Sequence, residues 1–186
     1  GYGFLNTYLI IDSDPRIPEG HTGIITACSV TLDGVLQKTG IPARLEYAGR
    51  FAVDNDGPAR FLDLIGYRGT SVDPLHLFIS AGLTSINRLV TTRSGVALAN
   101  VREVPAAAED RVKEAVRLMT ESGFVFPAGG GIGEFNLPEH PYRLPVVAFS
   151  GMNMVGNAVE KGYALKTEIG AGNIPFEKIA DATGSR

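Results

Sequence analysis

TGIITACSVTLDGVLQKTGIPARLEYAG, residues 22–49, is the stretch that says most about the fold. Its apolar, β-branched run over 23–32 predicts a buried strand, and 33–40 predict a short helix that ends at Gly40. The following PARLEYA (42–48) predicts another strand. Strands and helices mix along the rest of the chain without a strict βαβα order. The sequence therefore predicts an α+β fold, with mixed β-sheets and flanking helices.

A second stretch, RLPVVAFSGMNMVGNAVEKGYALKTEIGA (143–171), has the same layout of strand, turn, helix, glycine and strand. The aligned positions include Gly34 with Gly156 and Gly40 with Gly162. An internal duplication explains this similarity, and so does chance at this length. If the duplication is real, the single domain 1–186 has two pseudo-symmetric lobes, about 19–104 and 123–180. A small ligand would then bind in the cleft between them.

The other predicted elements are short. Further predicted strands are FLNTYLIID (4–12), RFAVD (50–54), ARFLDLIGY (59–67), GVALANVREV (95–104), LPVVAF (144–149) and YALKTE (163–168). Predicted helices are 74–82, 85–90, 105–123 and 151–162. The span 127–145 predicts a loop, and its GGGIG (129–133) is no dinucleotide fingerprint because Glu134 stands where the last glycine is needed.

Composition limits the possible functions. The chain has 186 residues, 44% hydrophobic and 20% charged, which is ordinary for a soluble domain with a real core. A net charge of −3 argues against nucleic-acid binding by this chain alone. We expect a cytoplasmic protein, because there is no membrane-length apolar run and no secretory signal, and the single cysteine excludes an internal disulfide. Because the chain opens on Gly1, we expect it to be part of a longer protein.

Cys28, Ser29 and Thr31 form the first candidate site, at the turn from the second strand into the helix. Hydroxyl and backbone N–H groups at such a turn can hold a carboxylate. Cys28 has a structural alternative, as a small buried hydrophobe. The three histidines have no metal-ligand spacing, and we expect neither a metal nor a cofactor.

Arg102 is the second candidate, because an arginine in a buried strand needs an anionic partner. Glu103 points to the opposite face of the strand, so the partner is either a structural carboxylate from elsewhere or a bound ligand. Arginine's planar fork suits a carboxylate.

The third candidate lies in IGYRGTSVDPLHLF (65–78). A residue before proline avoids helical geometry, so Asp73 is predicted as the N-cap and Pro74 as the first helical residue. The negative charge of Asp73 makes the helix tip a poor seat for an anion. The candidate ligand contacts are then the residues just upstream, Gly69, Thr70 and Ser71, which are either ligand-binding or plain architecture.

Three of these segments together resemble a known family. TACSVTLDGVLQKTGIPAR, IGYRGTSVDPLHLFISAGLTSI and LANVREVPAAAEDRV resemble, in order and spacing, the regulatory domain of the nitrogen regulatory repressor NrpR. The family's C-S-[VI]-T cysteine falls on Cys28, its Y-x-G-T-S-x-D-P motif on Tyr67 to Pro74, and its R-E-[IV]-P arginine on Arg102. One segment departs from the family pattern, because Met152 and Met154 stand in a helix that is usually GGLNP-like. This difference leaves room for an altered ligand choice.

The resemblance implies a sensory domain rather than an enzyme. Family members repress nitrogen-assimilation genes and are released from DNA when 2-oxoglutarate binds. The resemblance further implies homodimers, and contact with DNA only through a winged-helix segment that this chain lacks. The alternative is an enzyme acting on a small carboxylate with Cys28 as nucleophile. That mechanism needs a base within hydrogen-bond reach of the sulfur, and no histidine is an obvious candidate.

Overall fold

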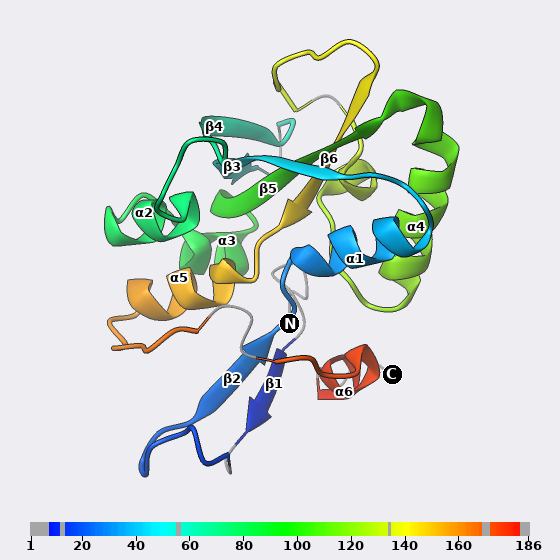
Figure 1. The fold of residues 1–186 in the computed structure, drawn as a ribbon. Helices are drawn as coiled ribbons and strands as arrows, with labels where there is room; N and C mark the ends of the chain where they lie inside the picture. The colour runs from blue at the N-terminus through cyan, green and yellow to red at the C-terminus, as the bar shows by residue number, and fades with distance from the viewer. Residues whose placement is uncertain (1–7, 12–13, 55–56, 134, 169–171, 183–186) are drawn as a thin grey trace.

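The computed structural model describes residues 8–11, 14–54, 57–133, 135–168 and 172–182, and it has the predicted α+β fold (Figure 1). Its strands are β1 (Tyr8–Ile11), β2 (Gly23–Thr26), β3 (Arg44–Val53), β4 (Arg60–Gly66), β5 (Gly95–Pro105) and β6 (Arg143–Phe149). Its helices are α1 (Val30–Lys38), α2 (Pro74–Ser80), α3 (Ile86–Thr92), α4 (Glu109–Glu121), α5 (Met152–Glu160) and α6 (Phe176–Ala182). Single 3₁₀ turns lie at Ala106–Ala108 and Ala128–Gly131.

The main sheet has four antiparallel strands in the order β4-β3-β5-β6. Strand β5 lies between β3 and β6 and is buried over most of its length, so its side chains alternate between two covered faces. On one face, Val104 packs with Leu32 and Leu36 of α1 and with α4, and Leu98 packs with α2. On the other face the cluster contains Ala97, Ala99, Val101, Phe51, Phe61, Phe135, Val147 and Phe149.

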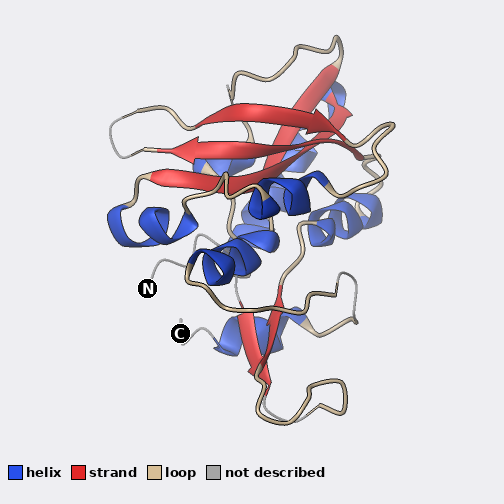
Figure 2. Cartoon of the chain, turned by 90° about the vertical axis from the view of Figure 1, so that its left-hand side faces the viewer, coloured by secondary structure: helices blue, strands red, loops and turns tan. Residues whose placement is uncertain are grey.

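Strands β1 and β2 form a separate antiparallel hairpin, with Ile10 paired to Ile24. It projects from the side of the helical layer that is opposite the main sheet (Figure 2). Helix α6 packs against β1, so the first and last described elements of the chain lie together. Within the described residues, no helix is long and apolar enough to cross a membrane.

The two aligned stretches of sequence form similar local structure in different surroundings. Helices α1 and α5 begin at the same distance before the aligned glycines Gly34 and Gly156. The turns that precede them also meet, because a Cβ on Gly151 would lie 2.7 Å from the carbonyl oxygen of Ala27. Strand β2, however, belongs to the hairpin and β6 to the main sheet, where it pairs with β5. The proposed lobe boundary between β5 and β6 therefore runs through one sheet, and the division into two lobes stays a prediction.

The structure differs from the predicted elements in three places. The β-branched run 23–32 stops as a strand at Thr26, and Val30 and Thr31 begin α1 instead. The predicted strands 42–48 and 50–54 are one strand, β3, which runs through Gly49. Gly49 does not break it, because its missing Cβ lets Asp63 and Phe61 of β4 approach closely. Residues 163–168 form no strand.

Candidate functional site

Two buried polar side chains interrupt the apolar layer on the face of β5 that α1 and α2 cover. Asn100 is 3% exposed and Arg102 is 0% exposed, and both lie on the same face because they are two residues apart in a strand. Glu103 points the other way, where it contacts Arg44 and His140. Asn100 and Arg102 therefore form a polar site between the clusters around Leu98 and Val104.

Asp33 of α1 is the anionic partner of Arg102. Arg102 Nε donates to Asp33 Oδ1 at 3.0 Å, and Nη2 donates to Oδ2 at 2.9 Å. This bidentate pair is the structural carboxylate that was one of the two predicted alternatives. The Asp33 side chain is 29% exposed whereas Arg102 is fully buried, so the pair connects the interior to the surface.

Ser29 joins this pair to Asn100. Its hydroxyl oxygen accepts from Arg102 Nη2 at 3.1 Å and from Asn100 Nδ2 at 2.9 Å. Ser29 is the N-cap of α1, yet its side chain makes no capping hydrogen bond because the oxygen is turned toward β5. The hydroxyl proton stays free to donate, since no acceptor for it is found within the described ranges.

Tyr67 brings the third candidate segment to the same network. Its hydroxyl donates to Asn100 Oδ1 at 3.0 Å, so the loop that contains Gly69, Thr70 and Ser71 starts at the polar site. Burial raises the pKa of Tyr67 well above its usual range, the Asp73 carboxylate raises it further, and the positive charge of Arg102 lowers it. We call the set Ser29, Asp33, Tyr67, Asn100 and Arg102 the Arg102 network.

One donor of the Arg102 network has no acceptor. Arg102 Nη1 is buried and makes no hydrogen bond to any of the residues that the structure describes. Leaving a buried donor unsatisfied costs about 1–3 kcal/mol, and more for a charged group. Nη1 and the Ser29 hydroxyl are therefore two donors that an anionic ligand could satisfy.

The predicted site residues meet only in part. Ser29 and Arg102 are in direct contact, whereas Cys28 and Thr31 are exposed beside them at the start of α1. In the loop after β4, Gly69 has a left-handed φ of 82° and Ser71 is exposed. Thr70 Oγ1 donates weakly to the carbonyl oxygen of Val72 at 3.4 Å. Ligand binding by these residues stays a prediction.

Asp33 and Asn100 were not among the predicted site residues, although the position of each in the sequence indicates that it lies near one of them. Asp33 is four residues after Ser29, which places the two on one face of a helix. Asn100 is two residues before Arg102 in a strand, which places them on one face of the sheet. Asp33 was missed because the helix was predicted to begin at residue 33. Ser29 and Asp33 share a helix face only if the helix begins before Asp33, as α1 does.

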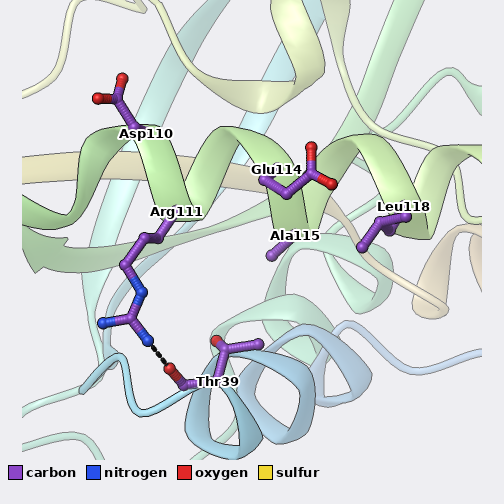
Figure 3. Close-up of a pocket in the computed structure, with 6 residues that line it drawn as sticks. All are labelled: Thr39, Asp110, Arg111, Glu114, Ala115 and Leu118. Atoms are coloured by element: carbon purple, nitrogen blue, oxygen red, sulfur yellow. Dashed lines mark hydrogen bonds between the residues drawn. The ribbon is translucent and has the colours of Figure 1, made fainter.

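The structure has a hollow at the other end of α1 (Figure 3). It has a volume of about 510 Å³ and is lined by Thr39, Asp110, Arg111, Glu114, Ala115 and Leu118. Arg111 of α4 donates to the main-chain oxygen of Thr39 across it. None of the predicted ligand-binding residues lines this hollow.

The enzymatic alternative depends on a base for Cys28. The thiol is exposed, and within the described ranges no side chain is hydrogen-bonded to its sulfur. His140 contacts Glu103, and His21 contacts the main-chain oxygen of Glu19. The described residues also contain no group of three or more His, Cys, Asp or Glu side chains placed to hold a metal ion.

Comparison with known proteins identifies the class of the chain. The family model described as NrpR regulatory domains NRD1 and 2 matches residues 1–181. The chain is 35% identical over 157 residues to the global nitrogen regulator NrpRI of Methanosarcina mazei, covering 81% of the chain and 48% of that relative. It is 29% identical over 147 residues to the global nitrogen regulator NrpR of Methanococcus maripaludis, covering 78% of the chain and 27% of that relative.

A solved structure has the same fold. The crystal structure of a nitrogen repressor-like protein from Methanococcus jannaschii superposes with a TM-score of 0.64 at 23% identity, covering 88% of this chain and 67% of that one.

The curated relatives are regulators, and the matching model describes regulatory domains, so the class is that of a regulatory domain. The chain belongs to the NrpR family of nitrogen regulators, and it spans about half or less of the length of these curated relatives.

Proposed function

We propose that this domain senses a small dicarboxylate, with 2-oxoglutarate as the first candidate, and that the ligand switches repression by an attached DNA-binding segment. The observation that carries the proposal is Arg102 Nη1, a fully buried cationic donor without an acceptor among the described residues. A carboxylate is the small-molecule group that best matches such a donor. The family membership supports a regulatory role for the ligand.

The segments around the Arg102 network supply the other donors. One carboxylate of the ligand would accept from Arg102 Nη1 and the Ser29 hydroxyl. The hydroxyls of Thr70 and Ser71, the backbone at Gly69, and the exposed Cys28 and Thr31 would surround the rest of the ligand. Polar groups from three separate elements would thus meet at one ligand, as is usual in small-molecule sites.

DNA contact is proposed for a winged-helix segment outside residues 1–186, because the net charge of −3 gives this chain little electrostatic attraction for phosphates. The domain is proposed to act as a homodimer. The ligand would favour one arrangement of the attached segments over another, and the shift can be no larger than its difference in affinity for the two arrangements. Light scattering of the purified chain, with and without ligand, tests the dimer.

Calorimetric titration with 2-oxoglutarate tests the ligand, with circular dichroism to show that the fold is intact. Arg102→Lys is expected to weaken binding at least tenfold, because lysine cannot offer the planar fork. Arg143→Lys is the matched control, because Arg143 is exposed at the start of β6. No heat from the folded wild-type chain would overturn the proposal.

The loop contacts are tested separately by the double variant Thr70→Ala/Ser71→Ala. It is expected to weaken 2-oxoglutarate binding several-fold without lowering the unfolding midpoint, because the Thr70 hydroxyl makes only one weak hydrogen bond within the loop. Unchanged affinity would show that residues 69–71 serve the architecture of the loop alone.

A further inference from the structure

We infer that Asp33 competes with the effector's carboxylate for the positive charge of Arg102, so that the Asp33 carboxylate must leave the guanidinium when the ligand binds at Nη1. Asp33 would then set both the affinity of the site and its requirement for a carboxylate. This inference rests on the proposed function, and it adds to it the residue Asp33 and a competition for Arg102.

Charge balance is the first argument. Arg102 is the cation of the Arg102 network, and Asp33 already neutralises it through the two hydrogen bonds at 3.0 and 2.9 Å. A carboxylate added at Nη1 with Asp33 still in place would bring a second negative charge beside a single buried positive one. Burying a charge without a partner is strongly unfavourable. The entering carboxylate therefore needs the charge of Asp33 to leave.

Exposure shows which of the two partners can move. Arg102 is fully buried in the central strand of the sheet, and its Nη2 is also held by Ser29. The Asp33 side chain is 29% exposed and lies on a surface helix. Its carboxylate can turn into water and regain its hydration, which the guanidinium of Arg102 cannot do without unfolding the strand. Displacement therefore moves Asp33 and leaves Arg102 in place.

The charge of Asp33 gives the chemical selectivity. Asp33 is held by two parallel hydrogen bonds from Nε and Nη2 of Arg102. A ligand at Nη1 releases Asp33 only if it brings a full negative charge of its own. An amide brings no charge, so the competition with Asp33 selects against ligands in which this carboxylate is amidated.

The same exchange has a structural consequence for α1. Arg102 binds Asp33 and Ser29, which lie on the first turns of α1, and β2 ends shortly before this helix. When Asp33 is released, the start of α1 loses its only ionic attachment to β5 among the described residues. The β1–β2 hairpin is joined to this end of the helix, so ligand binding would be transmitted to the hairpin.

Asp33→Asn tests the inference, with calorimetric titration of 2-oxoglutarate and the thermal midpoint as readouts. Asparagine keeps the shape and one acceptor but removes the competing charge. The variant should have a lower midpoint than wild type without ligand, and it should bind 2-oxoglutarate at least tenfold more tightly. A purely structural role for Asp33 would weaken binding instead. Asp63→Asn is the matched control, because Asp63 also pairs with an arginine, Arg50, in an exposed pair between β3 and β4.

The outcomes separate the inference from the proposed function. If wild type binds 2-oxoglutarate and Asp33→Asn binds equally or more weakly, the displacement is wrong while the ligand assignment stands. If neither binds, the proposed function fails and the inference fails with it.

A second measurement does not depend on the folding of Asp33→Asn. In the wild-type chain, ligand should speed hydrogen exchange of the α1 amides that follow Asp33, relative to those of α4. Slower exchange there in the bound state would overturn the displacement.

Discussion

Tyr67 is the residue at which burial and charge determine a measurable pH dependence. Burial and the nearby Asp73 carboxylate raise its pKa above the usual 10.0, so the folded state keeps a phenolic proton that the unfolded chain loses above about pH 10. The unfolded state then binds fewer protons than the folded state. The stability that Tyr67 contributes is therefore fully present below pH 10 and is lost as the pH rises toward its folded-state pKa.

We predict that Tyr67→Phe lowers the free energy of unfolding by about 1–2 kcal/mol near neutral pH, because the buried Asn100 Oδ1 loses its donor. Between about pH 9 and pH 11 the difference between wild type and variant should narrow, since only wild type has this group to titrate. Urea unfolding across this range measures both effects. Tyr142→Phe is the control, because Tyr142 is 90% exposed. A difference that widened with pH would contradict the assignment.

The loop that contains GGGIG shows at the level of an element what glycine permits. The sequence predicted a loop here that is not a dinucleotide-binding motif. In the structure, its turn Ala128–Gly131 packs against β6. Gly129 and Gly131 both have a φ of 72°, a left-handed conformation that favours glycine. Their surroundings differ, because a Cβ on Gly131 would clash with the carbonyl oxygen of Val147, whereas Gly129 has no neighbour within 4 Å.

We predict that Gly131→Ala destabilises the domain by about 3 kcal/mol or more, since it adds a backbone clash to the left-handed strain. Gly129→Ala should cost only the strain, about 1 kcal/mol. Urea unfolding of the two variants measures the difference, which isolates the contact with β6. Equal destabilisation by the two variants would mean that Gly131 does not contact β6 closely in solution.

Local signals predicted the elements wherever neighbouring residues determine the structure. Asp73 is the N-cap of α2, its carboxylate accepts from the Leu75 N–H at 3.1 Å, and Pro74 is the first helical residue, as predicted. Gly40 ends α1 with a φ of 74°, also as predicted. The start of α1 was missed because Val30 and Thr31 favour strands by themselves. Packing of Leu32 and Leu36 under the sheet overrides that preference.

At the scale of the molecule, the pairing of strands that are distant in the sequence could not be predicted from the sequence pattern. The aligned stretches suggested two lobes, yet β2 and β6 lie in different sheets, and β5 pairs with both β3 and β6. The candidate site depends on this pairing, since Arg102 meets Ser29 and Asp33 only when α1 crosses the face of β5. Ser29 and Arg102 were therefore predictable as separate candidates, whereas the contact of Asp33 with Arg102 depends on the fold.

The shared sheet leads to a prediction about cooperativity. Because β6 covers one edge of β5, and because Val146 and Val104 lie in one cluster, residues on both sides of the proposed lobe boundary should unfold together. Val146→Ala should lower the free energy of unfolding by about 1–3 kcal/mol. Its urea midpoint should fall by the same amount whether it is measured by far-ultraviolet circular dichroism or by tyrosine fluorescence.

The fragment 19–104 should show no cooperative transition, because it leaves Val101 and Leu98 of β5 without their partners from β6 and α5. Two separate transitions in the whole chain, or a folded fragment 19–104, would favour independent lobes.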